Sequence, residues 1–270
     1  MIDSHLHLQD PVLLEKIDVI LPEIRSAGVA RLVVNGTRPD DWKAVGDLAS
    51  TNQEVIAFYG LHPWYVSGCR DGWEDLLRGR LESDVTAGVG EIGLDKWIRD
   101  HDMARQKVAF ASQLEMAQEF QRPAAIHCLK AWGALIDCLD KSPFAGRFLL
   151  HSYSGPEEMI EDFVQRGAWF SISGYFFRKD KAAKLAVFDS VPEDRILLET
   201  DAPDMLPPER LIGTSLSRPD TGKTANHPAN LLGVYKAYSE WAGISPEETR
   251  DRMKRNFASW YSGRDNQEST

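Results

Sequence analysis

The stretch RILLETDAP, residues 195–203, sets an apolar run directly before an acidic residue, Asp201. Short runs of this kind, rich in β-branched and apolar residues, recur along the chain, and helical spacing follows them. In order they cover residues 1–8, 30–37, 55–63, 86–95, 123–128, 147–154, 168–174 and 195–203. Eight apolar strands that alternate with amphipathic helices predict a parallel sheet covered by helices.

The number of units favours an α/β fold of the (β/α)8 TIM-barrel type over a doubly wound sheet. A doubly wound nucleotide fold has a glycine-rich turn after its first strand, whereas the first run here continues into HLHLQD, residues 5–10. Two further helices are expected near 228–242 and 246–261. Without a repeat or linker, a single domain is expected, and the long irregular stretch 203–227 lies where a barrel carries active-site loops.

Composition limits the possible partners. The chain has 270 residues, of which 43% are hydrophobic, and a net charge of −10. This acidity disfavours a broad nucleic-acid surface, but it allows a phosphate-bearing substrate in a pocket where bound cations supply positive charge. The sequence shows neither a long apolar run nor a secretory signal, and its three cysteines lack CxxC spacing. A cytoplasmic protein is expected, with no membrane partner and no obligate protein partner.

Six residues of metal-ligand type share one position, the end of an apolar run. The spacing of His5 and His7 puts both side chains on one face of the first strand. The other members end four later strands, and in a barrel such ends converge on one mouth. The six are His5, His7, Glu91, His127, His151 and Asp201.

Four imidazoles and two carboxylates suit a divalent ion such as Zn, Mn or Mg. Six ligands favour two metal ions over one, and a two-metal centre suits hydrolysis of a phosphoester. Taken singly, each residue also has a structural interpretation: a packed histidine, a helix cap at Glu91, or a turn at Asp201. The same register on five strands favours the metal site.

Other polar residues near the strand ends are candidates for substrate contacts. His62, in GLHP, either orients a ligand, touches substrate or precedes the turn at Pro63. His227 either begins a helix or contacts the rim of the mouth. Phe176 and Phe177 either pack a loop or stack on a base. The substrate-binding candidates are His62, Lys130 and Arg178, and Lys96, Arg99 and Lys223 are further candidates for phosphate contacts.

The motifs HLH, GLHP, GEIGLD, IHC, HSYSG and ETDAP, in this order, resemble the TatD family of metal-dependent deoxyribonucleases, in the amidohydrolase-like superfamily. The resemblance runs from about residue 1 to 261. It implies a barrel over 1–262, followed by a polar tail at 263–270. It also implies two divalent metals and hydrolysis of phosphodiester bonds in DNA.

The resemblance further assigns roles to the six candidates. One metal would be held by His5, His7, Glu91 and Asp201. Glu91 would bridge to a second metal held by His127 and His151, and Asp201 would accept the proton of the attacking water. Glu91 and Asp201 are therefore the expected catalytic residues.

Two departures from the family pattern lie in loops around the mouth. Many members have an arginine two residues after the fifth-strand histidine, where this chain has Leu129. Members commonly read NEP before the last helices, where this chain has NHP with His227. These changes touch substrate choice and leave the metal ligands intact.

Three hypotheses follow. The first is a deoxyribonuclease that acts on DNA ends or single-stranded DNA, because a shallow mouth suits an end better than an intact duplex. The second is a hydrolase of a small phosphoester, lactone or amide with the same centre, which the acidic charge and Leu129 motivate. The third is a barrel without catalytic activity.

Overall fold

The computed structural model describes residues 1–262, and the expected tail at 263–270 lies outside the described residues. Eight strands follow one another through one sheet in chain order. They are β1 (Ile2–Leu6), β2 (Arg31–Asn35), β3 (Val55–Tyr59), β4 (Gly88–Asp95), β5 (Ala124–Leu129), β6 (Phe148–Leu150), β7 (Ala168–Ser173) and β8 (Ile196–Glu199). Seven lie within the ranges expected from the sequence, and β5 extends one residue past its expected end at 128.

Helices connect these strands. They are α1 (Pro11–Leu14), α2 (Ile17–Ser26), α3 (Pro39–Thr51), α4 (Trp73–Ser83), α5 (Met103–Glu119), α6 (Trp132–Lys141), α7 (Ile160–Gln165), α8 (Ala182–Ala186), α9 (Leu231–Ala242) and α10 (Pro246–Ser262). The first strand also lies beside the last, since the Asp201 amide donates to the His5 carbonyl (3.0 Å). The predicted (β/α)8 TIM-type fold is thereby confirmed.

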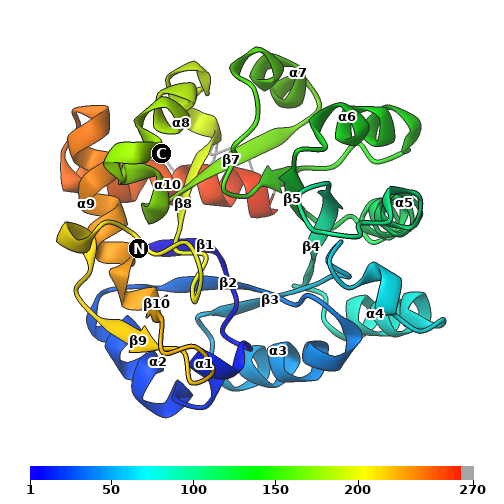
Figure 1. Ribbon diagram of the computed structural model, residues 1–270, viewed down its shortest axis with the longest axis horizontal. Coiled ribbons are helices and arrows are strands. Elements are labelled where there is room, and N and C mark those ends of the chain that lie inside the picture. Colours follow the sequence, from blue (N-terminus) through cyan, green and yellow to red (C-terminus); the bar gives the residue numbers. More distant parts are fainter. Residues whose placement is uncertain (263–270) are drawn as a thin grey trace, which may run out of the picture. The chain divides into compact units, whose positions relative to one another are not determined.

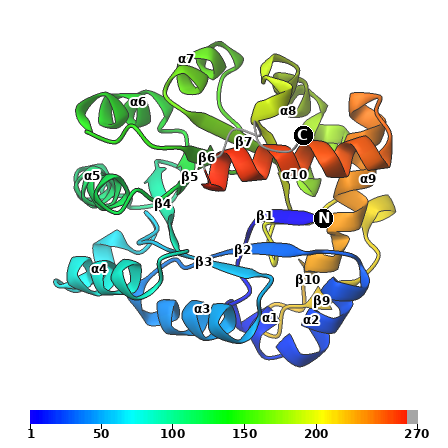
Figure 2. The ribbon, with the colours of Figure 1, turned by 180° about the vertical axis from the view of Figure 1, so that it is seen from behind.

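The chain divides into two compact units. The first comprises residues 1–33 and the described residues from 170 onward; the second comprises residues 34–169. In the first unit, α10 contacts both β1 and β8 and is the red helix of Figure 2. In the second unit, α3, α4, α5 and α6 lie outside strands β3 to β5 (Figure 1).

One expectation from the sequence was wrong in detail. The stretch 203–227 contains a short hairpin, in which β9 (Ser215–Ser217) pairs antiparallel with β10 (Thr224–Asn226). The Asn226 amide donates to the Pro203 carbonyl (2.9 Å), so the hairpin is tied to the segment after β8. Its strands are three residues long and largely polar, too short to show an alternating pattern in the sequence.

Three residues that lie one or two positions after a strand have left-handed backbone conformations without being glycine. Lys130 follows β5 with φ 54°, Ser152 lies two residues after β6 with φ 42°, and Asp201 lies two residues after β8 with φ 52°. Such conformations cost energy in residues with a β-carbon and are found more often at functional sites than elsewhere.

Two buried glutamines of α5 hold the backbone at the ends of two strands in the second unit. Gln113 accepts from the Leu61 amide (2.6 Å) and donates to the Leu61 carbonyl (3.2 Å). One side chain therefore satisfies both backbone groups next to His62. Gln106 does the same for Asp95, at 2.8 and 3.0 Å.

Replacement of Gln113 by alanine should destabilise the protein strongly. It leaves the buried amide and carbonyl of Leu61 without their partner, which we expect to lower the free energy of unfolding by about 2–4 kcal/mol. Chemical denaturation measures the change. Gln165→Ala, on the exposed face of α7, is the matched control and should change stability by less than about 0.5 kcal/mol. Equal effects of the two variants would contradict this role of Gln113.

Candidate metal centre

The first unit brings two histidines and a carboxylate together. The Nε2 atoms of His5 and His7 lie 3.3 Å apart, and Asp201 Oδ1 lies 3.7 Å from His5 Nε2 and 3.5 Å from His7 Nε2. His5 is fully buried, and the His7 side chain is 14% exposed. One atom from each residue thus points to a common position. We call His5, His7 and Asp201 the first cluster.

Asp3 fixes the backbone on both sides of the first cluster. Its carboxylate accepts hydrogen bonds from the amide (2.9 Å) and hydroxyl (2.5 Å) of Thr200, and from the His5 amide (3.3 Å). Burial, the largest influence, raises the pKa of Asp3 to about 8, although the hydrogen bonds from Thr200 oppose this. Of the two residues that Asp3 bonds, His5 belongs to the first cluster and Thr200 directly precedes Asp201, which also belongs to it.

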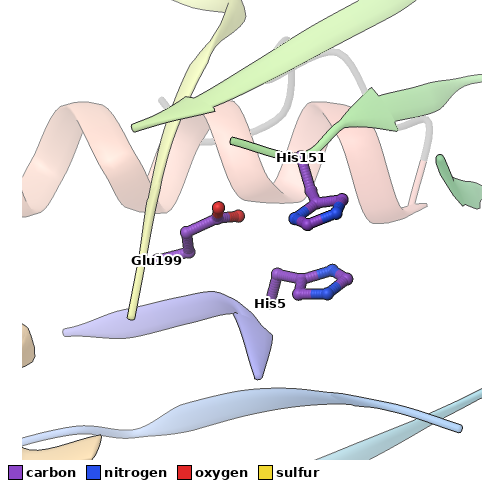
Figure 3. Close-up of side chains that lie close together, drawn as sticks. All are labelled: His5, His151 and Glu199. Atoms are coloured by element: carbon purple, nitrogen blue, oxygen red, sulfur yellow. The ribbon is translucent and has the colours of Figure 1, made fainter. Parts of the chain in front are cut away.

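Glu199 is a further buried carboxylate of the first unit. It ends β8, and Ser171 Oγ donates to its Oε2 atom. Figure 3 draws its side chain with that of His5, and a nitrogen of His5 lies within 4.8 Å of a carboxylate oxygen of Glu199. The interior of the first unit is therefore polar beside His5.

The second unit gathers three imidazoles around one carboxylate oxygen. Glu91 Oε1 lies 2.8 Å from His151 Nε2, 3.1 Å from His127 Nδ1 and 3.2 Å from His62 Nε2. The facing nitrogens of His127 and His151 are 3.3 Å apart. All four side chains are nearly buried, and we call them the second cluster.

Glycine explains how β4 and β5 lie so close together beside the second cluster. Gly93, in GEIGLD, has φ 145°, and a β-carbon there would lie 1.9 Å from the His127 carbonyl oxygen. The pairing of β4 with β5 is irregular between Val89 and Ile92, next to Glu91. Only glycine fits this approach of the two backbones.

His62 carries its proton on the nitrogen that faces Glu91. The Trp64 amide donates to His62 Nδ1 (3.2 Å), so the neutral ring is protonated at Nε2. That nitrogen lies 3.2 Å from Glu91 Oε1, which makes His62 a donor to the carboxylate. In this protonation state Nε2 has no lone pair to offer a metal.

Asp95 orients the ring of His127. Its Oδ2 atom lies 2.9 Å from His127 Nε2 and 2.7 Å from Trp64 Nε1, and the Trp97 amide donates to Oδ1. Burial alone would raise the pKa of Asp95, but the hydrogen bonds from His127 and Trp64 outweigh it and lower the pKa to about 2. Burial alone would also lower the pKa of His127, and its bonds to Asp95 and Glu91 raise it instead.

Both clusters have the donor chemistry of a divalent metal site. Four ligands at zinc bond lengths in a tetrahedron are about 3.3–3.4 Å apart, and the first cluster has spacings of 3.3–3.7 Å. A carboxylate that receives the outer nitrogen of a ligating histidine is the usual support of such a site, and Asp95 has this position behind His127. The donor atoms, nitrogen and oxygen, fit Zn or Mn.

The remaining candidates from the sequence lie in different surroundings. Lys130 is exposed directly after β5, and Arg178 is exposed after β7, with Nε 3.2 Å from Asp180 Oδ1. Phe176 and Phe177 are buried, and Phe176 packs edge to face on Phe188. Both phenylalanines therefore pack the fold, and the stacking alternative is wrong.

His227 begins a short helix, as one of its two interpretations stated. Its Nδ1 atom accepts from the Ala229 amide (3.1 Å), and its Nε2 atom lies 3.0 Å from Glu23 Oε2. The residue is fully buried, and burial lowers its pKa more than Glu23 raises it. Its ring therefore favours the neutral form.

The sequence interpretation missed Asp95, Glu199 and the two glutamines of α5. Asp95 had a signal, because it stands four residues after Glu91 in the same strand and so on the same face. Gln106 and Gln113 had none, since their roles depend on which loops α5 covers.

A TIM-type fold with histidine and carboxylate clusters at its strand ends is typical of metal-dependent hydrolases. Residues 2–262 match the family model described as TatD related DNase. The chain belongs to the TatD family, as its motifs predicted.

Curated relatives agree with this membership. The chain is 30% identical, over 85% of each protein, to the "3'-5' ssDNA/RNA exonuclease TatD" of Cronobacter sakazakii. It is also 30% identical to the "uncharacterized metal-dependent hydrolase YjjV" of Escherichia coli, over 76% of this chain and 80% of that protein.

Solved structures agree on the fold. The crystal structure of the TatD homologue YjjV from Escherichia coli K12 superposes with a TM-score of 0.87 at 26% identity, over 97% of this chain and 98% of that one. A hydrolase of the TatD family from Entamoeba histolytica has a TM-score of 0.84 over 97% of each chain, and its 20% identity supports the fold alone. No helix within residues 1–262 is long and apolar enough to cross a membrane.

Asp95→Asn should weaken metal binding without unfolding the protein. The asparagine amide places an NH2 group where His127 and Trp64 need an acceptor, and this disturbs the orientation of the His127 ring. Loss of such a supporting partner typically lowers metal affinity 10–100-fold. Calorimetric titration of metal-free protein with Zn or Mn measures this. Asp71→Asn, on an exposed loop, should bind as the wild type does; an unchanged affinity of Asp95→Asn would refute the role of Asp95.

His227→Asn should flatten the pH dependence of stability. Because the folded pKa of His227 lies below the unfolded value, the unfolded chain binds more protons as pH falls through about 6.5, and folding is weakened there. The free energy of unfolding of the wild type should therefore fall, relative to the variant, between pH 7.5 and 5.5. Asparagine keeps a capping acceptor. A relative gain of wild-type stability at low pH would mean that the Glu23 ion pair outweighs burial.

Proposed function

We propose that the protein is a metal-dependent nuclease that hydrolyses phosphodiester bonds at the ends of single-stranded DNA. The observation that carries this proposal is the pair of clusters, each of which presents imidazole nitrogens and a carboxylate oxygen 2.8–3.7 Å apart. The relatives named as 3'-5' exonucleases of single-stranded DNA and RNA support the substrate class and favour attack from the 3' end.

We assign one divalent ion to each cluster. His5, His7 and Asp201 would hold the first ion; Glu91, His127 and His151 would hold the second. The bridging role that family resemblance implies for Glu91 stays a prediction, as does the choice among Zn, Mn and Mg. The bound ions would supply Lewis acidity toward the phosphate and a water of lowered pKa.

The chain's own residues orient these groups and move the proton. Asp201 is the proposed acceptor of the proton from the attacking water, which forms the new bond to phosphorus as the bond to the leaving oxygen breaks. Its backbone is fixed by the bonds from Thr200 to Asp3. His62 donates to Glu91 and holds its carboxylate, and Asp95 holds His127 with Nδ1 toward Glu91.

Asp201→Asn and Glu91→Ala should each abolish most of the activity. Asparagine cannot accept the proton, and loss of a general base typically costs 10²–10⁴-fold. We expect kcat to fall at least about a hundredfold in both, measured by release of nucleotides from a 3'-labelled single strand with Mg, Mn or Zn. Asp189→Asn, exposed before β8, is the charge-matched control and should retain wild-type turnover.

The same assay separates the proposal from its rival. A panel of small phosphoesters, lactones and amides tests the alternative that the acidic charge and Leu129 motivate. Turnover of a small ester by metal-loaded protein that leaves DNA and RNA intact would replace the nuclease proposal. Unchanged turnover in folded Asp201→Asn would refute the assignment of the base. Elemental analysis of protein purified without added metal identifies the ions.

A further inference from the structure

An open pocket of about 360 Å³ lies in the first unit, apart from the first cluster. Residues 178–180, which follow β7, line one part of it, and residues 206–209 with Ile212, which follow β8, line the other. The second part is mostly apolar, with Leu206, Pro207 and Pro208. The first part carries two cations, Arg178 and Lys179. The volume suits one small ligand.

The apolar part of the pocket is held in place by two close contacts with glycine residues. A β-carbon on Gly174 would lie 2.7 Å from Pro207 Cβ, and one on Gly233 would lie 2.5 Å from the Leu211 carbonyl oxygen. The segment around Pro207 and Leu211 therefore packs directly on the end of β7 and on α9. Pro207 is buried, Pro208 is half-buried, and both have a fixed φ. The apolar surface is thus built before any ligand arrives.

The cationic part suits a phosphodiester. Residues 178–181 comprise three cationic side chains and one acid, in a chain whose net charge is −10. Asp180 is paired with Arg178 Nε (3.2 Å) and with Lys181 Nζ (3.1 Å). The ion pair of Arg178 uses Nε, so its two terminal nitrogens are not part of it. Lys179 is exposed beside them.

The pocket is also close to the first cluster along the chain. Leu206 follows Asp201 by five residues, which can span at most about 18 Å. The segment is shorter than that limit, because the Asp204 amide bonds back to the Asp201 carbonyl (2.8 Å) in a turn. A single-stranded nucleic acid whose end is at Asp201 would therefore reach the pocket within a few nucleotides.

We propose that this pocket is a subsite for one nucleotide of the substrate strand, away from the bond that is cleaved. The base lies on the surface of Leu206, Pro207 and Pro208, and the adjoining phosphate contacts Arg178 and Lys179. Bases bind flat apolar surfaces without regard to sequence. The subsite therefore favours longer nucleic-acid strands and does not select among nucleotide sequences. The inference rests on the proposed nuclease function, and it adds that strand length is sensed at this pocket.

The test compares strands of different length. For the double variant R178A/K179A, kcat/KM on a 12-nucleotide single strand relative to that on a dinucleotide should fall about tenfold from the wild-type ratio. Fluorescence anisotropy with a labelled 12-nucleotide strand should show an affinity loss of similar size. The dependence of log K on log salt should become shallower by about 0.7 for each phosphate contact removed.

Two further variants sharpen the outcome. E209Q removes an acid from the pocket lining and should tighten binding of the 12-nucleotide strand. Lys254→Ala removes a single cation from α10, whose Asn256 bonds the Ile196 carbonyl at the opposite end of β8, and should change neither readout. Wild-type length dependence and affinity in R178A/K179A would overturn the subsite. A wild type that binds the strand without cleaving it would overturn the nuclease function, and the anisotropy comparison would still decide the subsite.

Discussion

The contact between the first strand and the last is the constraint on which the first cluster depends. His5 and Asp201 are nearly 200 residues apart in the chain, and only the pairing of their strands brings them together. The buried carboxylate of Asp3 secures that pairing, because it accepts from Thr200 and His5 at once. A polar group so deeply buried is stabilising only while all its partners are present. The pairing of β1 with β8 and the arrangement of the metal ligands therefore depend on the same hydrogen bonds.

The second cluster depends on a different principle, a series of hydrogen bonds directed inward. Trp64 donates to both His62 and Asp95, His62 donates to Glu91, and Asp95 receives His127. The rings of His62 and His127 thereby each have one nitrogen held by a supporting group. The tautomers of these two rings are set by the protein before any ion binds, so little reorganisation of them remains for the moment of binding.

Much of this could be predicted from the sequence, for a physical reason. Parallel strands covered on both faces are apolar throughout, so a histidine or carboxylate at the end of such a run stands out, as His127 does in IHC and Asp201 in ETDAP. Residues that act through tertiary packing gave no such signal. Gln113 looks like any polar helix residue until α5 is placed against Leu61, and the β9–β10 hairpin is too short and polar for its pattern to be seen. Which nitrogen of His62 carries the proton also needed the position of the Trp64 amide.

The left-handed residues that follow three of the strands restrict how this family member can diverge. Lys130, Ser152 and Asp201 each adopt a conformation that glycine, asparagine and aspartate enter readily and that β-branched residues resist. At these positions the backbone excludes valine, isoleucine and threonine whatever the substrate requires. In this chain, variants built to change specificity are thus restricted to few residue types at the three positions where the chain leaves β5, β6 and β8.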